Sequence, residues 1–246
     1  MKLLLLGTSG YHPTDRRQTS CLMLPEIGVV LDAGTALYRV REHLRPGGLD
    51  IFLTHAHLDH VIGLTYLFDI LYQQAVERAV VHGEPQKLAA IQKHLFAQEL
   101  FPAMPPIDWR PLEREVPLRD GGVLRSFPLT HPGGAVGYRL DWPGRSLAYV
   151  TDTTAGSGIE YREHIRGVDV LVHECYFTDD WGPWAEKTGH SCLTPVARLA
   201  AEAQVGRLVL VHTNPLERSM EPLPLDEVKN IFPRIEIGFD DQQIDF

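Results

Sequence analysis

Four side chains of metal-ligand type fall within residues 54–60, which read THAHLDH. They are His55, His57, Asp59 and His60. The run before them, 50–53, is short and apolar like a buried strand, and the run after them, 61–68, has the apolar spacing of a helix. A turn between the two would aim the four side chains beyond the carboxyl end of the strand, where α/β sheets bind ligands. Because polar groups are costly to bury together without partners, this cluster predicts a metal site.

The same run resembles the His-x-His-x-Asp-His signature of the metallo-β-lactamase superfamily. The resemblance implies an α/β fold of the metallo-β-lactamase type, a four-layer αβ/βα sandwich, with a single such domain over residues 1–246. It also implies further ligands after later strands. The candidates are His131, Asp152 and His212, each placed at the end of a strand-like run.

The complete set implies two divalent metal ions. By the resemblance, one ion is held by His55, His57 and His131, the other by Asp59, His60 and His212, and Asp152 bridges both. Two ions about 3.5–4 Å apart can share a water, lower its pKa toward 7 and so supply a hydroxide nucleophile. Asp59 gains a second, catalytic role in orienting that hydroxide. At the position of His57, the motif of the iron-dependent reductases of the superfamily has Glu. The resemblance therefore favours Zn²⁺, with Mn²⁺, Fe²⁺ and nickel as alternatives.

Two further motifs point to phosphodiesters. Residues 170–175, VLVHEC, form a buried-strand pattern that ends in His-Glu, and residues 185–191 contain Gly-His-Ser. Both resemble the ribonuclease Z branch of the superfamily, in which the Glu orients the second His. By this resemblance Glu174 holds His190, and His190 contacts the phosphate and acts as general acid on the leaving oxygen. From the residues alone, a surface carboxylate and an unrelated loop histidine remain an alternative.

A loop near the start of the chain is a candidate anion site. Residues 6–10, LGTSG, follow an apolar strand, and Arg16 and Arg17 come shortly afterwards. Glycines allow tight turns, and exposed amides together with Arg can hold an anion. We therefore predict Ser9, Arg17 and His190 as substrate-binding residues. This segment resembles one shared by ribonuclease Z and the cyclic phosphodiesterase of bacterial phosphonate degradation (PhnP-like). Residues 235–241 also resemble the tail of that phosphodiesterase.

The chain departs from both relatives. Ribonuclease Z carries a long basic arm that grips tRNA, whereas the interval from Asp152 to His190 contains no basic, glycine-rich insertion. The phosphonate-pathway enzyme holds an additional zinc with early cysteines, and residues 11–15 contain none. The substrate therefore cannot be inherited from either relative.

The composition and net charge of the chain limit the classes of substrate and partner that it can bind. The 246 residues, 44% of them hydrophobic, suffice for a large globular domain. A net charge of −9 without any extended Lys/Arg run disfavours a large nucleic acid, so we predict a small phosphodiester partner. No stretch approaches the roughly 20 apolar residues of a membrane span. The first apolar run is too short for a signal peptide, and three scattered cysteines indicate no disulfide framework, so we expect a cytoplasmic enzyme; a homodimer stays open.

The leading function is thus that of a dinuclear metal hydrolase, a phosphodiesterase acting on a small or cyclic phosphodiester with His190 as general acid. One alternative is an endoribonuclease activity like tRNA 3′ processing, and another is hydrolysis of a lactone, thioester or β-lactam. A non-catalytic binder is the least favoured, because the ligand set is intact.

The remaining patterns predict the elements and two segments of interest. Thr194 followed by Pro195 predicts an N-cap and first turn of a helix running to 203. The proline-rich run 101–117 is expected to pass over the surface as a connection, with a lid or a dimer contact as the alternatives. Aromatic residues gather in 176–184, where they either stack on a base of the substrate or pack the loop onto the body. Predicted strands are 2–6, 20–24, 28–32, 50–53, 123–129, 135–141, 145–150, 168–173 and 207–211, and predicted helices are 35–45, 60–75, 85–98 and 159–166.

Overall fold

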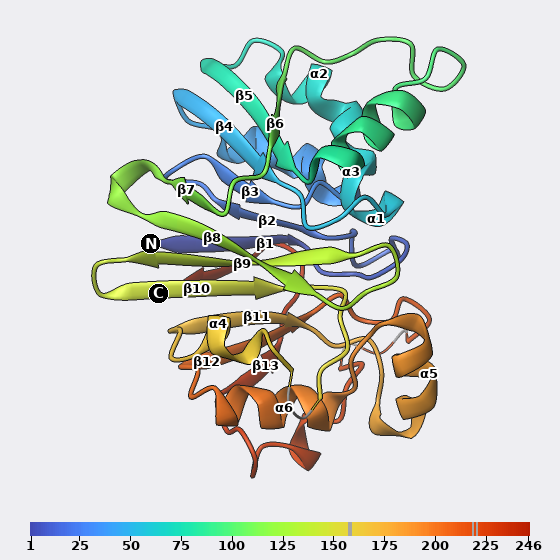
Figure 1. The fold of residues 1–246 in the computed structure, drawn as a ribbon, viewed down its shortest axis with the longest axis vertical. Coiled ribbons are helices and arrows are strands. Elements are labelled where there is room, and N and C mark those ends of the chain that lie inside the picture. Colours follow the sequence, from blue (N-terminus) through green and yellow to red (C-terminus); the bar gives the residue numbers. More distant parts are fainter. Residues whose placement is uncertain (157–158, 218, 220) are drawn as a thin grey trace. The chain divides into compact units, whose positions relative to one another are not determined.

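The computed structural model describes residues 1–156, 159–217, 219 and 221–246 (Figure 1). The chain forms two compact units. The N-terminal unit contains Met1–Glu113 and Phe239–Asp245, and the C-terminal unit contains Arg114–Gly238. Each unit contains one seven-stranded sheet. A single domain over residues 1–246 stays a prediction.

The sheet of the N-terminal unit has the order β14-β1-β2-β3-β4-β5-β6. The strands from β14 to β3 pair antiparallel, and those from β3 to β6 pair parallel. The last strand of the chain, β14, therefore returns to the first. The bounds are β1 Lys2–Gly7, β2 Cys21–Leu24, β3 Val29–Leu31, β4 Gly47–Phe52, β5 Val76–Gly83, β6 Asp108–Pro111 and β14 Gln242–Asp245.

Short helices cover this sheet with their apolar side chains. Leu37, Leu64 and Leu88 pack into one core with the strand residues Ile51 and Val81. The helix predicted over 60–75 is broken, because the Gly63 N–H donates to the Ala33 carbonyl at 2.8 Å, outside the helix. The bounds are η1 Thr35–His43, α1 Leu58–Val61, η2 Ile62–Tyr66, α2 Leu67–Leu71, α3 Pro85–Ala90 and a π-helical turn, η3, Ile91–Leu95.

The sheet of the C-terminal unit has the order β13-β12-β11-β10-β9-β8-β7, with parallel pairing from β13 to β10 and antiparallel pairing from β10 to β7. The strands are β7 Glu115–Pro117, β8 Val123–Leu129, β9 Ala135–Trp142, β10 Arg145–Val150, β11 Val170–Glu174, β12 Arg207–Val211 and β13 Ile235–Ile237.

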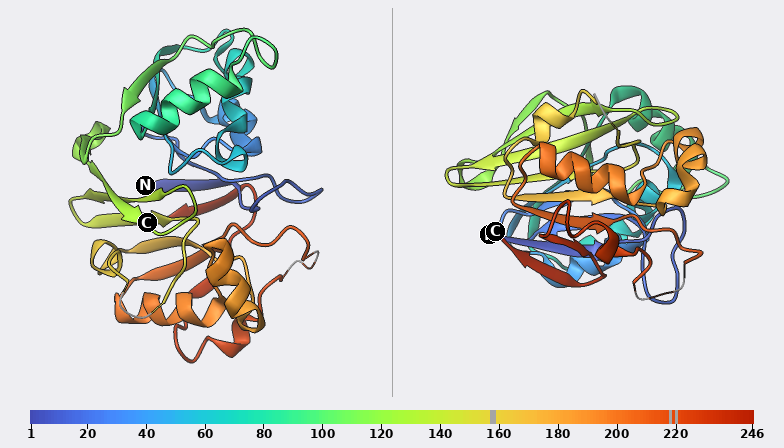
Figure 2. Two further views of the ribbon diagram at one scale, coloured as in Figure 1. Left: turned by 45° about the vertical axis from the view of Figure 1, so that its right-hand side comes forward. Right: turned by 90° about the horizontal axis from the view of Figure 1, so that it is seen from below.

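The main helix of this unit, α6 (Leu193–Glu202), lies along its sheet (Figure 2). Its residues Val196, Leu199 and Ala200 share a core with Leu171 of β11 and Leu208 of β12. The other helices are η4 Arg119–Gly121, α4 Arg162–Ile165, η5 Asp179–Trp181, α5 Gly182–Thr188 and η6 Leu225–Glu227. Among the described helices of either unit, none combines the length and the apolar character that a membrane crossing requires.

Two predictions about local structure are wrong. The run 101–117 is more than a connection, because it contains β6 and β7, each at an edge of its sheet. Edge strands tolerate proline, since one side of their backbone needs no partner. In α6 the N-cap position belongs to Cys192, not Thr194. The carboxylate of Asp179 accepts the Thr194 N–H at 2.9 Å, so a neighbouring segment supplies the cap.

Candidate metal-binding site

The ligand-type side chains of the N-terminal unit lie where β4 gives way to α1. His55 follows the strand, His57 is the N-cap of the helix, and Asp59 and His60 belong to its single turn. The rings of His55 and His60 have centroids 4.2 Å apart, and those of His55 and His57 are 4.5 Å apart. His55 and His60 are buried, Asp59 is half-buried and His57 is exposed. The structure thus gathers all four predicted residues of this unit.

A buried carboxylate that sequence reasoning missed orders two of these histidines. Asp32, directly after β3, accepts a hydrogen bond from His60 Nδ1 at 2.9 Å. It also accepts from the Thr54 hydroxyl at 2.9 Å, and that hydroxyl lies 3.0 Å from His55 Nδ1. Since the Thr54 proton goes to the carboxylate, His55 Nδ1–H is the donor in the second bond. Both histidines therefore present Nε2 to a ligand, and the acidic residue closing the apolar run 29–31 was the signal for this role.

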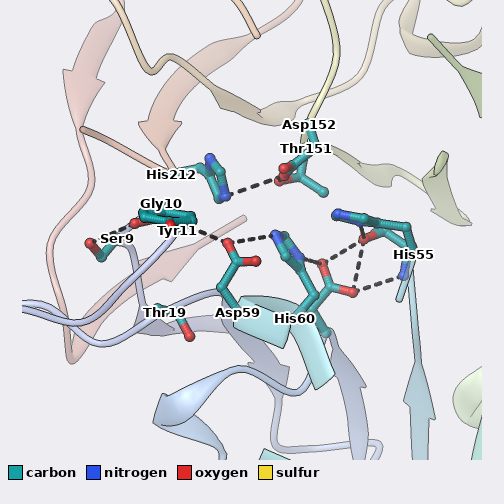
Figure 3. Close-up of polar contacts among 12 residues, drawn as sticks. Ser9, Gly10, Tyr11, Thr19, His55, Asp59, His60, Thr151, Asp152 and His212 are labelled. Carbon is teal, nitrogen blue, oxygen red and sulfur yellow. Dashed lines mark hydrogen bonds and ion pairs between the residues drawn. The ribbon is translucent and has the colours of Figure 1, made fainter. Parts of the chain in front are cut away.

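Asp59 is held by the loop between β1 and β2. Its Oδ2 accepts the Tyr11 N–H at 2.8 Å and lies 3.4 Å from His60 Nε2 (Figure 3). Gly34 allows this close packing, because a Cβ there would come within 2.4 Å of the Asp59 carbonyl oxygen. The loop thus positions the carboxylate that is predicted to act both as ligand and in catalysis.

The predicted substrate residues of this loop have roles inside it. The buried Ser9 hydroxyl donates to the His12 carbonyl at 2.9 Å. Arg17 donates to the Thr8 hydroxyl at 2.6 Å, and that hydroxyl donates to Asp240 at 2.8 Å. Burial lowers the pKa of Arg17, and the charge of Asp240 opposes this shift. These contacts shape the loop, and contact of Ser9 and Arg17 with substrate stays a prediction.

In the C-terminal unit the ligand-type residues come from three strand ends. His131 follows β8, Asp152 follows β10 and His212 follows β12. Asp152 Oδ2 lies 3.6 Å from His131 Nε2, and Asp152 Oδ1 lies 3.3 Å from His212 Nε2 (Figure 3). His131 Nδ1 donates to the Gly189 carbonyl at 2.9 Å, which directs its Nε2 toward the carboxylate. All three side chains are buried.

Three of these strand ends turn through left-handed backbone. The φ angles of Asp32, Asp152 and His212 are 62°, 39° and 54°. Non-glycine residues in this region cost on the order of 1–3 kcal/mol each, and such strain gathers at functional sites. The packing of the neighbouring buried strands offsets this cost. The left-handed conformation turns each side chain away from the end of its strand.

Glu174 and His190 form the predicted pair. Glu174, at the end of β11, is fully buried, and its Oε1 lies 3.1 Å from His190 Nδ1. The same oxygen accepts the N–H groups of Thr153 and Ser191, each at 3.1 Å. A carboxylate oxygen can only accept, so His190 Nδ1 carries the hydrogen of this bond. Asp152, His190 and His212 each offer an atom within 4.8 Å of the others.

A second pair that sequence reasoning missed supports this strand end. His173 Nδ1 donates to the Glu174 carbonyl, and its Nε2 lies 2.9 Å from the Tyr161 hydroxyl. Burial lowers the pKa of His173 and raises that of Tyr161, so the neutral imidazole accepts the phenolic proton. This bond anchors β11 next to Glu174. The His-Glu sequence pointed to the histidine, but nothing local pointed to Tyr161.

The donor set of each unit fits divalent metal ions. Imidazole nitrogen and carboxylate oxygen are the ligands that zinc, manganese and iron share. His55, His60 and His131 each use Nδ1 in a hydrogen bond to a hydroxyl, carboxylate or carbonyl oxygen, which is the usual support of a metal-binding histidine. The chemistry of the residues thus agrees with the prediction made from their spacing.

Comparison with known proteins identifies the family of this chain. Residues 28–213 match the β-lactamase superfamily domain. Ribonuclease Z of Salinibacter ruber is 30% identical over 303 aligned positions, covering 95% of this chain and 90% of that protein.

Solved structures share the fold. The metallo-β-lactamase fold protein YhfI of Bacillus subtilis has a TM-score of 0.80 at 18% identity, covering 99% of both chains. A diphosphatase of the PhnP family has a TM-score of 0.75 at 20% identity, covering 100% of this chain and 97% of that one. With the two mixed sheets and their helices, these likenesses confirm the αβ/βα fold predicted from the signature.

Proposed function

Because this chain belongs to the metallo-β-lactamase superfamily, we propose that it is a divalent-metal-dependent phosphodiesterase. Membership establishes the coarser statement, a metal-binding hydrolase related to ribonuclease Z. The phosphodiester specificity is the proposal, and one observation carries it: the buried pair of Glu174 and His190.

The geometry of this pair suits a general acid. Glu174 is fully buried and accepts from His190 Nδ1 at 3.1 Å, which fixes the orientation of the imidazole ring. His190 is partly exposed, with 15% of its side chain accessible, so it can reach a substrate. Proton transfer from Nε2 to the departing oxygen neutralises an alkoxide, which is the difficult leaving group of a phosphodiester. Hydrolysis of a lactone, thioester or β-lactam, the alternative chemistry, leaves this pair without an evident task.

The metal ligands are proposed as the resemblance implies. His55, His57 and His131 would hold one ion, Asp59, His60 and His212 the other, and Asp152 both. Ions held there would supply Lewis-acid activation of water and of the phosphoryl oxygen. Asp59, fixed by the Tyr11 N–H, is proposed to orient the attacking water. Zn²⁺ is the favoured ion, with Mn²⁺ and Fe²⁺ as alternatives.

The substrate has two candidates. The name of the Salinibacter relative favours RNA, in contrast to the small phosphodiester that net charge predicts. The alignment with that protein spans 303 positions, more than the 246 residues of this chain, so the relative carries segments without a counterpart here. This shortening and the net charge of −9 favour a short RNA end or a small diester over an extensive grip on folded RNA.

The first experiment is hydrolysis of bis(p-nitrophenyl) phosphate by the full chain, after chelation and after re-addition of zinc or manganese. We expect metal to restore turnover and His190→Ala to abolish most of it while metal content stays constant. Absence of turnover with two ions bound per chain, together with cleavage of a lactone or thioester, would replace the phosphodiesterase proposal. A 3′-extended RNA and a cyclic nucleotide, compared next, separate the two substrates.

A further inference from the structure

A hollow in the C-terminal unit lies between the segment that follows β11 and the segment that follows β12. Its cavity volume is about 70 Å³. Tyr176, Phe177 and Trp181 line one side, and Asn214, Glu217 and Leu223 line the other. A hollow of this size can hold one part of a substrate, such as a single ring, but not a whole drug-sized molecule.

The hollow adjoins the proposed general acid. The ring of Tyr176 stacks on that of His190, with centroids 4.9 Å apart and planes at 21°. The same ring lies 5.9 Å from that of His212. Since Tyr176 also lines the hollow, a group bound there would be separated from His190 by one aromatic ring. The hollow and the proposed general acid therefore share Tyr176 as a neighbour.

The sequence left two roles open for the aromatic residues of 176–184, packing the loop onto the body and stacking on the substrate. Different residues of the segment suit each role. Phe177 is buried, with 7% exposure, and packs with Ala185 and Cys192, so it holds the loop to the body of the unit. Trp181 is 56% exposed, and its ring stacks on that of Phe177 with centroids 6.2 Å apart. The backbone N–H of Trp181 donates to the Thr178 carbonyl at 3.2 Å, so this bond fixes the backbone and does not involve the indole. A rigid, exposed indole at a pocket rim suits stacking on a flat ring.

The charge of the hollow excludes a phosphate as its occupant. None of its lining residues in the described part of the chain is basic, and Glu217 contributes a carboxylate. An anion would be repelled there, whereas a neutral heterocycle would not. Thr213 and Asn214 also line the hollow and carry hydroxyl and amide groups that can bond to the edge of a base.

We propose that this hollow binds a nucleobase of the substrate, stacked on Trp181. The proposal rests on the proposed phosphodiesterase function and narrows its substrate to diesters that carry a nucleoside. Stacking of a base on an aromatic side chain, which alanine substitution removes, changes affinity by about tenfold or more.

The test compares two inhibitors of bis(p-nitrophenyl) phosphate hydrolysis that differ only in the base. Adenosine 5′-monophosphate should inhibit about tenfold more strongly than ribose 5-phosphate. Trp181→Ala should abolish this ratio, and Trp181→Phe, which keeps a ring, should retain most of it. Trp184→Ala is the matched control, because Trp184 is 48% exposed on the same segment but does not line the hollow.

Equal inhibition by the two compounds in the unmodified protein would overturn the proposal, and so would a ratio that survives Trp181→Ala. The quenching of tryptophan fluorescence by the same compounds tests the hollow without turnover. Quenching by adenosine 5′-monophosphate alone, lost in Trp181→Ala, would support the base site even if no diester were hydrolysed. Failure of the phosphodiesterase function and failure of the base site are thus seen separately.

Discussion

The two units supply ligand-type residues in different ways. In the N-terminal unit, His55, His57, Asp59 and His60 come from one strand end and one helical turn. In the C-terminal unit, His131, Asp152 and His212 follow three different strands and meet only through sheet pairing. A cluster from one turn is visible as a motif, whereas a cluster from three strands depends on register. The comparison separates what a local sequence encodes from what a sheet assembles.

The units also support their histidines differently. One carboxylate, Asp32, holds His60 directly and His55 through Thr54. In the C-terminal unit, His131 rests on the Gly189 carbonyl, and a carboxylate, Glu174, supports His190 instead. We infer that the supporting carboxylate controls metal affinity in the N-terminal unit and proton transfer in the C-terminal unit.

The largest expected effect is that of His190→Ala. Removal of a general acid should lower kcat by about 10²- to 10⁴-fold, and the metal content should not change. Steady-state kinetics with elemental analysis of the same samples would measure both. His94→Ala, at an exposed histidine, is the control. Loss of metal in parallel with activity would mean that His190 acts as a ligand, and the contrast between the units would fail.

Asp32→Asn should weaken metal binding by about 10- to 100-fold, as is typical for partners of metal ligands. The amide would place a donor where the Thr54 and His60 donors converge. Competition with a chelator of known affinity measures the change. Retention of full metal affinity would show that Asp32 has only a structural role.

Glu174→Gln should leave the metal content intact and lower kcat by about 10- to 100-fold. The neutral amide can still accept from His190, but its bond is weaker than that of a carboxylate and holds the ring less firmly. The same chelator competition and kinetics apply. If Asp32→Asn and Glu174→Gln lost metal equally, the proposal that one carboxylate controls metal affinity and the other proton transfer would be wrong.

Gly189→Ala should destabilise the fold by about 2 kcal/mol, because φ is +75° and a Cβ would come within 2.5 Å of Pro132 Cδ. Urea unfolding measures the loss. Gly144→Ala is the matched control, with φ of +78° and nothing within 4 Å of its Cβ, and should cost about 1 kcal/mol. Equal losses would mean that the contact beside His131 adds nothing to the backbone cost.

Asp179→Ala should have the smallest effect, a loss of about 1 kcal/mol in the free energy of unfolding, since it removes the cap of α6. The Thr194 hydroxyl also donates to Asp179 Oδ2, and Thr194→Val removes this bond while keeping the backbone N–H and the residue's size. A near-zero change in Asp179→Ala would show that water or another group replaces the carboxylate at the start of α6.

The parts that could be predicted share a local cause. The apolar strands 2–6, 123–129, 145–150 and 207–211 are present, because their patterns depend on neighbouring residues alone. The strands β5, β13 and β14 and the edge strands of 101–117 were not predicted. Their sequences are short, charged or rich in proline, so their pairing depends on the backbone partners that neighbouring strands offer.

By itself the amino-acid sequence determined the ligand types, the cluster at 55–60 and the strand ends that carry His131, Asp152 and His212. These follow from residue chemistry and from periodicity over a few residues. The tertiary structure alone decided that Asp32 supports two histidines, that Tyr161 anchors His173 and that Asp179 caps α6. Each of these contacts joins residues from separate elements, and such contacts depend on how a sheet pairs and how helices pack rather than on the order of neighbouring residues.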